Sequence, residues 1–196
     1  MSYADLTISE FLDEIASTAV VPAGGSAAAV TGATGAALCE MACIHTIEKD
    51  EHDDVTANLA AVRDDLGALR VALLELADDD AATLDALLSA STDEEVEAAS
   101  KDGTRVPLET AEGCLEVVEH AGVVTEAATP NAVPDAVIGA FLAQGALRAA
   151  VYTVRTNLGH LDDQAFVEEV GRRAAAIETT AGEAAERVSA NAGADR

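Results

Sequence analysis

Hydrophobic residues recur along this chain at steps of three and four, the spacing of one side of an α-helix. The clearest series lies in a long predicted helix and consists of Val55, Leu59, Val62, Leu66, Leu69, Leu73 and Leu76. Continuing the same steps reaches Asp80, Thr83 and Leu87, so a carboxylate stands where a leucine is expected. Burying a carboxylate is costly unless it is paired or used in chemistry. Asp80 is therefore the first functional candidate, and a structural role as a cap or as the partner of an arginine is the alternative.

Two helices are predicted before this one. Thr7 and Glu10 have the pattern of a capping box, which predicts a short helix that runs to about Thr18. The segment Pro22-Ala23-Gly24-Gly25-Ser26 predicts a turn that leads into a long helix from Ser26 to about Glu48. Small residues line this long helix at Ala28, Gly32, Gly35 and Ala36. Because small side chains let neighbouring backbones approach closely, we expect this helix to be central and buried.

Three more helices are predicted in the second half of the chain. The segment from Ser91 to Gly103 is polar and acidic, and we interpret it as a connection with one or two helical turns. Pro107 then favours the first turn of a fourth helix, and Pro134 the start of a fifth. The expected inner stripe of the fifth helix is Asp135, Gly139, Leu142, Ala146, Ala149, Thr153 and Asn157. A sixth helix follows Gly159 and is expected to fray past Ala190.

No segment keeps the strict alternation that a β-strand would need. Aromatic residues make up only 3% of the chain and tryptophan is absent, which favours closely packed helices over sheet. The sequence therefore predicts one domain, residues 1–196, with an all-α fold. We expect an up-and-down bundle of about six helices around a long central small-residue helix.

Charge narrows the classes of function. The chain carries 36 Asp and Glu residues against 11 Lys and Arg residues, for a formal net charge of −25. Such a field repels phosphate backbones and anionic lipid headgroups, so neither nucleic acid nor a membrane is expected as a partner. Lysine occurs only at Lys49 and Lys101. We interpret this balance as adaptation to a salt-rich cytoplasm, where ions screen the repulsion between carboxylates.

The cysteines and histidines indicate neither disulfide nor metal chemistry. Cys39, Cys43 and Cys114 lie in apolar helical segments without disulfide spacing, which favours reduced thiols. The N-terminal residues lack the pattern of a secretory leader, so we expect a cytoplasmic location. The four histidines form no cluster with metal-ligand spacing, so no metal is expected.

The Gly24-Gly25-Ser26 turn has two interpretations. It could present N–H groups and a helix N-terminus to an anionic ligand, or it could be a tight turn in which Ser26 caps the helix. It lacks the glycine spacings of nucleotide-binding loops, so no nucleotide is expected. Asp135 is similarly ambiguous, because the backbone dipole alone favours an aspartate near a helix start.

Several short motifs follow one another in the chain: Pro22-Ala23-Gly24-Gly25-Ser26, Met41 before Thr46 and Lys49, Leu76-Ala77-Asp78-Asp79-Asp80-Ala81, Pro107-Leu108, Pro134-Asp135 and Asn157-Leu158. Together they resemble the formiminotetrahydrofolate cyclodeaminase and methenyltetrahydrofolate cyclohydrolase family over roughly residues 6–170. Ala23, Glu48, Pro134 and Thr153 depart from the usual residues of that family, and the connection over 89–104 is shortened. These departures concern substrate preference more than fold.

The resemblance implies a helical homodimer that acts on a reduced folate, with no bound cofactor, metal or nucleotide. It implies a catalytic role for Asp80, which would orient or deprotonate water, with Asp135 as an assisting acid/base or pterin-binding group. Lys49 would handle a developing charge or a folate carboxylate. The Gly24-Gly25-Ser26 turn and Asn157 would shape the substrate pocket and hydrogen-bond to its contents.

The first functional hypothesis is a methenyltetrahydrofolate cyclohydrolase that produces 10-formyltetrahydrofolate, because no formiminotransferase segment accompanies the chain. Formiminotetrahydrofolate cyclodeaminase, which releases ammonia, is the alternative and would use the same site. A third hypothesis is a helical scaffold that has lost its chemistry, which the Glu48 and Thr153 departures permit. Against the scaffold stands the retention of Asp80 and Asp135, since an inert bundle could replace them with apolar residues and avoid the cost of unpaired buried carboxylates.

Overall fold

The computed structural model describes residues 2–49 and 53–193, with side-chain surroundings in the third helix described from Thr56 onward. The elements in chain order are η1 (Tyr3–Asp5), α1 (Ile8–Ile15), α2 (Gly24–Ile47), α3 (Asp53–Ser89), α4 (Asp93–Ala127), α5 (Val133–Leu158) and α6 (Gln164–Gly193). The described residues contain no strand. The predicted all-α, up-and-down architecture is confirmed.

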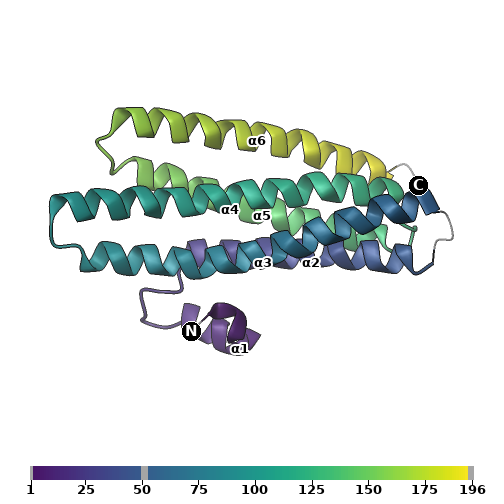
Figure 1. The fold of residues 1–196 in the computed structure, drawn as a ribbon, viewed down its shortest axis with the longest axis horizontal. Coiled ribbons are helices and arrows are strands. Elements are labelled where there is room, and N and C mark those ends of the chain that lie inside the picture. Colours follow the sequence, from purple (N-terminus) through teal and green to yellow (C-terminus); the bar gives the residue numbers. More distant parts are fainter. Residues whose placement is uncertain (1, 50–52, 194–196) are drawn as a thin grey trace.

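Four long helices make the bundle: α2 packs on α3 and α5, and α4 packs on the same two helices from the other side. The last helix, α6, lies along α4 and α5, whereas α1 stands outside the bundle (Figure 1). A hydrogen bond joins the N-terminal segment to α3, because the Tyr3 N–H donates to Asp78 Oδ1 at 2.8 Å. Tyr3 also packs edge-on against Phe11 of α1, with ring centroids 5.4 Å apart.

The core combines leucines from α3 with small residues from α2. Leu59, Leu66 and Leu73 are fully buried, as the three-and-four spacing predicts, while Val55 lies outside the residues whose side chains are described. On α2, a Cβ added at Gly35 would lie 2.6 Å from the carbonyl oxygen of Gly139 in α5. Only a glycine lets the two backbones come so close, so the expectation of a central small-residue helix is confirmed.

The predicted connection over Ser91–Gly103 is wrong, because α4 begins at Asp93 and runs through it. A capping box opens the helix: the Glu95 N–H donates to Thr92 Oγ1, and the Glu95 carboxylate accepts from the Thr92 N–H. This Thr-x-x-Glu pattern was visible in the sequence. Pro107 obscured it, since a proline suggests a helix start but here lies inside α4.

Two helix ends and the buried side of one helix also differ from the prediction. The capping box at Thr7 is confirmed, but α1 ends at Ile15 rather than near Thr18. The last helix continues to Gly193, past the predicted fraying point. The inner side of α5 is rotated from the predicted stripe, and its buried residues are Ala136, Gly139, Ala140, Ala143, Ala146, Leu147, Ala150, Val151 and Val154.

Two helices in the described part of the chain, α2 and α5, are long and apolar enough to cross a membrane by length and composition alone. About half of each apolar stretch is buried inside the bundle. Core helices of soluble proteins often have this length and apolar composition as well. Length and composition are thus shared by membrane-spanning helices and by core helices of soluble proteins, and the absence of a membrane partner stays a prediction.

Replacing Gly35 with alanine tests the close approach of α2 and α5. The new methyl group would collide with the Gly139 carbonyl, so we expect Gly35→Ala to lower the free energy of unfolding by about 1–3 kcal/mol. Gly182→Ala in α6 is the control, because no atom lies within 4 Å of the added Cβ, and it should gain about 0.5–1 kcal/mol. Urea titrations in concentrated potassium chloride measure both. Equal stability of the two variants would contradict the packing described here.

Candidate active site

The Asp80 carboxylate of α3 lies against the first turn of α2. Its Oδ2 accepts two hydrogen bonds from Ser26, one from the backbone N–H at 2.8 Å and one from Oγ at 2.9 Å. The N-terminus of a helix carries unpaired N–H groups and a partial positive charge, and both stabilise a carboxylate. Both bonds end on Oδ2, so Oδ1 is the oxygen that can face a ligand or a water molecule.

A glycine makes this contact possible. A Cβ added at Gly25 would lie 2.0 Å from Asp80 Oδ1 and 2.5 Å from Cγ, so any side chain at this position would displace the carboxylate. At Gly24, by contrast, nothing lies within 4 Å of an added Cβ. The two neighbouring glycines therefore differ in role, and only Gly25 is required for the approach of α3 to α2.

One of the two interpretations of this turn made Ser26 the N-cap of α2, and that interpretation is wrong. The helix begins at Gly24, its N-cap is Ala23, and Ala23 has no side chain that could accept a hydrogen bond. Asp80 supplies this missing acceptor from 54 residues away in the sequence. The helix N-terminus thus holds a carboxylate of the protein itself, and the binding of an anionic ligand there stays a prediction.

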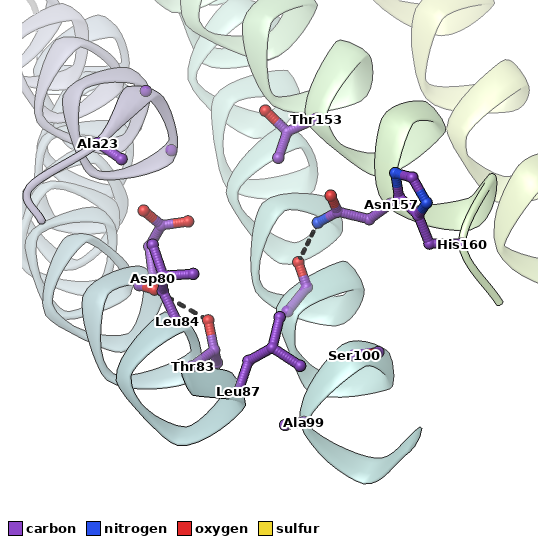
Figure 2. Close-up of a pocket in the computed structure, with 13 residues that line it drawn as sticks. Ala23, Asp80, Thr83, Leu84, Leu87, Ala99, Ser100, Thr153, Asn157 and His160 are labelled. Atoms are coloured by element: carbon purple, nitrogen blue, oxygen red, sulfur yellow. Dashed lines mark hydrogen bonds between the residues drawn. The ribbon is translucent and has the colours of Figure 1, made fainter. Parts of the chain in front are cut away.

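Asp80 lines a cavity of about 360 Å³ at this end of the bundle (Figure 2). Its wall comes from four helices and the segment after α5, and the residues are Ala23, Gly24, Gly25, Asp80, Thr83, Leu84, Leu87, Ala99, Ser100, Gly103, Thr153, Asn157 and His160. The spacing in α3 predicted Asp80, Thr83 and Leu87 on one side of the helix, and all three line the cavity. The remaining lining combines alanine and leucine side chains and three glycines with the polar residues Ser100, Thr153, Asn157 and His160.

Asn157 enters the cavity wall because of Pro107. A proline has no N–H, so the Gly103 carbonyl, four residues earlier in α4, loses its normal helical donor. The Asn157 amide replaces it, donating from Nδ2 to the Gly103 oxygen at 2.7 Å (Figure 2). The proline inside α4 and the asparagine at the end of α5 thus form one structural unit that fixes two cavity residues.

The segment that carries His160 is held by Lys101. The Lys101 ammonium contacts Asp163 Oδ2 at 2.8 Å and Glu97 Oε1 at 2.7 Å. The hydrogen bond from Lys101 is the main reason that the pKa of Asp163 is lower than usual. Asp163 also accepts the Phe166 N–H at the start of α6. His160 lines the cavity at its exposed edge and is, with Asp80, one of its two ionisable side chains among the described residues.

Lys49 and Asp135, two of the predicted catalytic residues, lie at the other end of the bundle. Lys49 is exposed and follows the C-terminus of α2, which begins beside Asp80 and extends for roughly 35 Å. Asp135 lies in the first turn of α5, roughly 33 Å along that helix from Asn157. Within one chain neither residue can contact Asp80 or the reacting part of a substrate bound beside it. The motif order did not reveal this, because each long helix separates its two ends by the length of the bundle.

Of the predicted site residues, the structure gathers Asp80, Gly24, Gly25, Ser26 and Asn157 at one end. Sequence reasoning missed Ser100, Gly103 and His160. The first two were hidden by the wrong connection before Pro107, and the Thr92 capping box was the signal that could have placed them on a helix. No comparable signal marks His160.

The described residues contain no group of three or more His, Cys, Asp or Glu side chains that could hold a metal ion. The three cysteines are buried and free, and burial raises the pKa of Cys39 and Cys114 to about 12. None of them lines the cavity. The chemistry available at this site is therefore that of a partly buried carboxylate, a histidine, hydroxyl groups and an amide.

Comparisons with known proteins agree on one family. The family model for formiminotransferase-cyclodeaminase matches residues 7–176. Methenyltetrahydrofolate cyclohydrolase from Methylorubrum extorquens is 38% identical over 194 residues, which cover 93% of each protein. Formimidoyltransferase-cyclodeaminase from Rattus norvegicus is 26% identical over 90% of this chain, which spans only 35% of that protein.

A crystal structure of formiminotetrahydrofolate cyclodeaminase from Thermotoga maritima has the same fold, with a TM-score of 0.93. The alignment covers 96% of each chain at 23% identity. The extent of the family match and the identity to the Methylorubrum protein establish the relationship. The chain belongs to the formiminotransferase-cyclodeaminase family.

Proposed function

We propose that this protein is a methenyltetrahydrofolate cyclohydrolase, which hydrolyses 5,10-methenyltetrahydrofolate to 10-formyltetrahydrofolate. The observation that carries the proposal is the Asp80 carboxylate, fixed by Ser26 through one oxygen at the wall of a cavity with a mainly apolar surface. The 38% identity to a cyclohydrolase over nearly the full length of both proteins supports the same reaction.

The substrate has a cationic amidinium carbon, and its hydrolysis begins with attack of water on that carbon. A carboxylate beside it stabilises the positive charge and accepts a proton from the attacking water. Oδ1 of Asp80 performs this role, because Oδ2 is engaged by Ser26. The adduct then breaks its bond to N5, which takes a proton, and the carbon remains on N10 as a formyl group. Asp80 can pass the proton it received to N5, and the hydroxyl proton of the adduct is released to solvent as the formyl C=O forms. The cationic substrate and water thus give a neutral formyl product and one proton, and the reaction balances without a cofactor.

The cavity suits a flat heterocycle. Its volume of about 360 Å³ lies within the usual range for small-molecule sites. Leu84, Leu87 and Ala99 offer an aliphatic wall for the ring faces, and Asn157 and Ser100 offer polar groups for its edges. We assign substrate binding to Asn157 and to the Gly24-Gly25-Ser26 turn. Lys49 and Asp135 have no role in the cavity of their own chain.

Formiminotetrahydrofolate cyclodeaminase remains the second candidate, because relatives with that activity in their names share the family and the fold. The higher identity to the cyclohydrolase favours hydrolysis. Ammonia release from formimino-folate, without acceleration of methenyl-folate hydrolysis, would reverse the choice. Absence of both activities and of folate binding would favour the non-catalytic scaffold.

The proposal extends to the setting of the protein. We propose a homodimer in a salt-rich cytoplasm, with a reduced folate as the small-molecule ligand and no bound cofactor or metal. The acidic composition supports the salt-rich setting, since a net charge of −25 on 196 residues is costly without screening.

Exchanging Asp80 for asparagine tests the chemistry. The asparagine amide would keep an oxygen for Ser26 but lose the proton acceptor, so we expect Asp80→Asn to lower kcat by about 10²–10⁴-fold. The measurement is the decay of the near-ultraviolet absorbance of methenyltetrahydrofolate, above its spontaneous rate, in concentrated potassium chloride. Asp79→Asn is the matched control, because Asp79 is exposed and lies outside the cavity lining. Full activity of Asp80→Asn would remove Asp80 from the mechanism.

The two adjacent glycines provide a geometric test. Gly25→Ala would push the Asp80 carboxylate away from Ser26, and we expect kcat to fall by about 10²-fold, since small misplacements of catalytic groups have such effects. Gly24→Ala adds its methyl group where no protein atom lies within 4 Å and leaves the Asp80 contact intact, so kcat should stay within about tenfold of wild type. Because Gly24 lines the cavity, the effect of this variant should fall on KM. If both variants lose kcat equally, the contact between Asp80 and α2 is not what positions the catalytic group.

Salt titration tests the proposed setting. Screening shortens the range of carboxylate repulsion to a few ångströms at molar ionic strength, so the urea midpoint of unfolding should rise as potassium chloride increases from about 0.1 M to about 2 M. Sucrose at matched osmolality is the uncharged control and should give a smaller rise. A midpoint that does not depend on salt would argue against adaptation to a salt-rich cell.

A further inference from the structure

The hydroxyl groups in the cavity wall have no proton left for a ligand. Thr83, Ser100 and Thr153 each donate from the side-chain oxygen to a backbone carbonyl three or four residues earlier in the same helix. The donor–acceptor distances are 2.9, 2.7 and 3.2 Å. A hydroxyl group has one proton and two lone pairs, so each of these side chains can only accept a further hydrogen bond. Three groups that usually serve as both donors and acceptors are therefore acceptors here.

The Gly103 carbonyl holds the amide of Asn157 in one orientation. A carbonyl oxygen can only accept, so the amide nitrogen must face it, and Nδ2 lies 2.7 Å from the Gly103 oxygen. Because of Pro107, the backbone N–H that would occupy this oxygen in a regular helix is missing. The amide keeps Oδ1 and one N–H for the cavity, and Figure 2 shows Oδ1 turned away from Gly103. The orientation of this cavity residue therefore depends on a proline in another helix.

The two sides of the cavity differ in their hydrogen-bonding groups. The side formed by α4 and α5 offers acceptors, which are the oxygens of Ser100, Thr153 and Asn157. Among the described residues of the lining, the side-chain donors that remain are one N–H of Asn157 and the ring of His160 at the exposed edge. Asp80 lies on the opposite side (Figure 2), against the start of α2, where backbone N–H groups supply donors. A ligand that spans the cavity from Asp80 should therefore carry donors at its far end.

We propose that Asn157, with Ser100 and Thr153, selects the donor edge of the substrate ring, which in a reduced folate is the 2-amino group and the neighbouring N3–H. The inference rests on the folate chemistry proposed above and specifies which end of the ring each side of the cavity holds. The 2-amino group lies at the far end of the ring system from N5, so the one-carbon bridge faces Asp80 when that group lies at Asn157. Asn157 determines the specificity, and Pro107 is a positioning residue because it acts through the Asn157 amide.

Equilibrium binding of tetrahydrofolate and of its 2-desamino analogue tests this assignment without turnover. The two ligands differ by one amino group, and a site with acceptors for that group rejects the ligand that lacks it. Wild type should bind tetrahydrofolate about 10–100-fold more tightly, because the analogue leaves an acceptor without a partner. The measurement is a calorimetric or fluorescence titration, without oxygen, in concentrated potassium chloride. Equal affinity of wild type for the two ligands would overturn the proposal.

Replacing Asn157 with leucine should remove the preference, leaving the two affinities within about threefold of each other. Asn157→Ala takes its place if the leucine variant does not keep its helical circular dichroism. Asn191→Leu is the matched control, because the Asn191 amide also donates to a backbone carbonyl, that of Gly122 at 3.0 Å, and lies outside the cavity lining. This control should keep the wild-type preference. A preference that survives the loss of Asn157, or that Asn191→Leu also removes, would contradict the role of Asn157.

Pro107→Ala tests the positioning role. The alanine returns a backbone N–H that can donate to the Gly103 carbonyl, which releases the Asn157 amide. The preference for tetrahydrofolate should then fall by about threefold or more, although the asparagine is still present. A purely structural role for Pro107 would change the urea midpoint and leave the preference at its wild-type value, and that result would reject Pro107 as a positioning residue.

Hydrolysis of methenyltetrahydrofolate, measured on the same preparations, separates this inference from the proposed reaction. A wild-type protein that hydrolyses the substrate but binds both ligands equally would keep the reaction and reject the selection of the donor edge. A clear preference for tetrahydrofolate without hydrolysis would keep the selection and reject the reaction. Failure to bind either ligand would overturn both.

Discussion

The arrangement of the candidate site depends on one contact, between the Asp80 carboxylate and the N-terminus of α2. Three features make it possible: Ser26 donates two hydrogen bonds, Gly25 leaves room for the carboxylate, and Ala23 provides no competing cap. The carboxylate thus accepts hydrogen bonds at the N-terminus of α2 and also lines the wall of the cavity. In the proposed mechanism, the hydrogen bonds to Ser26 use one oxygen of this carboxylate and the reaction uses the other, so a partly buried charge is both paired and available for chemistry.

The backbone packing of α2 brings the rest of the site to that contact. Gly35 and Gly139 allow the backbones of α2 and α5 to approach closely, and the start of α2 and the end of α5 line the same cavity. Pro107 and Asn157 then connect α4 to α5 through the Gly103 carbonyl. Each of these contacts joins residues that are far apart in the sequence, and together they hold four helices around one space.

The sequence predicted what local patterns encode. The leucine spacing placed Asp80 on the inner side of α3, and the small residues identified α2 as central. The contact between Asp80 and Ser26 was not predictable from pattern alone, because it joins two helices whose register depends on packing. Pro107 misled the assignment of α4, since its missing hydrogen bond is compensated by Asn157, a tertiary contact. Lys49 and Asp135 were grouped with Asp80 by motif order, which carries no information about the end of a helix on which a residue lies.

The most direct test of the account is a crystal structure with a non-hydrolysable reduced folate bound. The account predicts the pterin in the cavity between α2, α3, α4 and α5, with its one-carbon position within about 3–4 Å of Asp80 Oδ1 or linked to it by one water molecule. A folate bound instead at the opposite end of the bundle, beside Lys49 and Asp135, would contradict the assignment of Asp80 as the catalytic carboxylate.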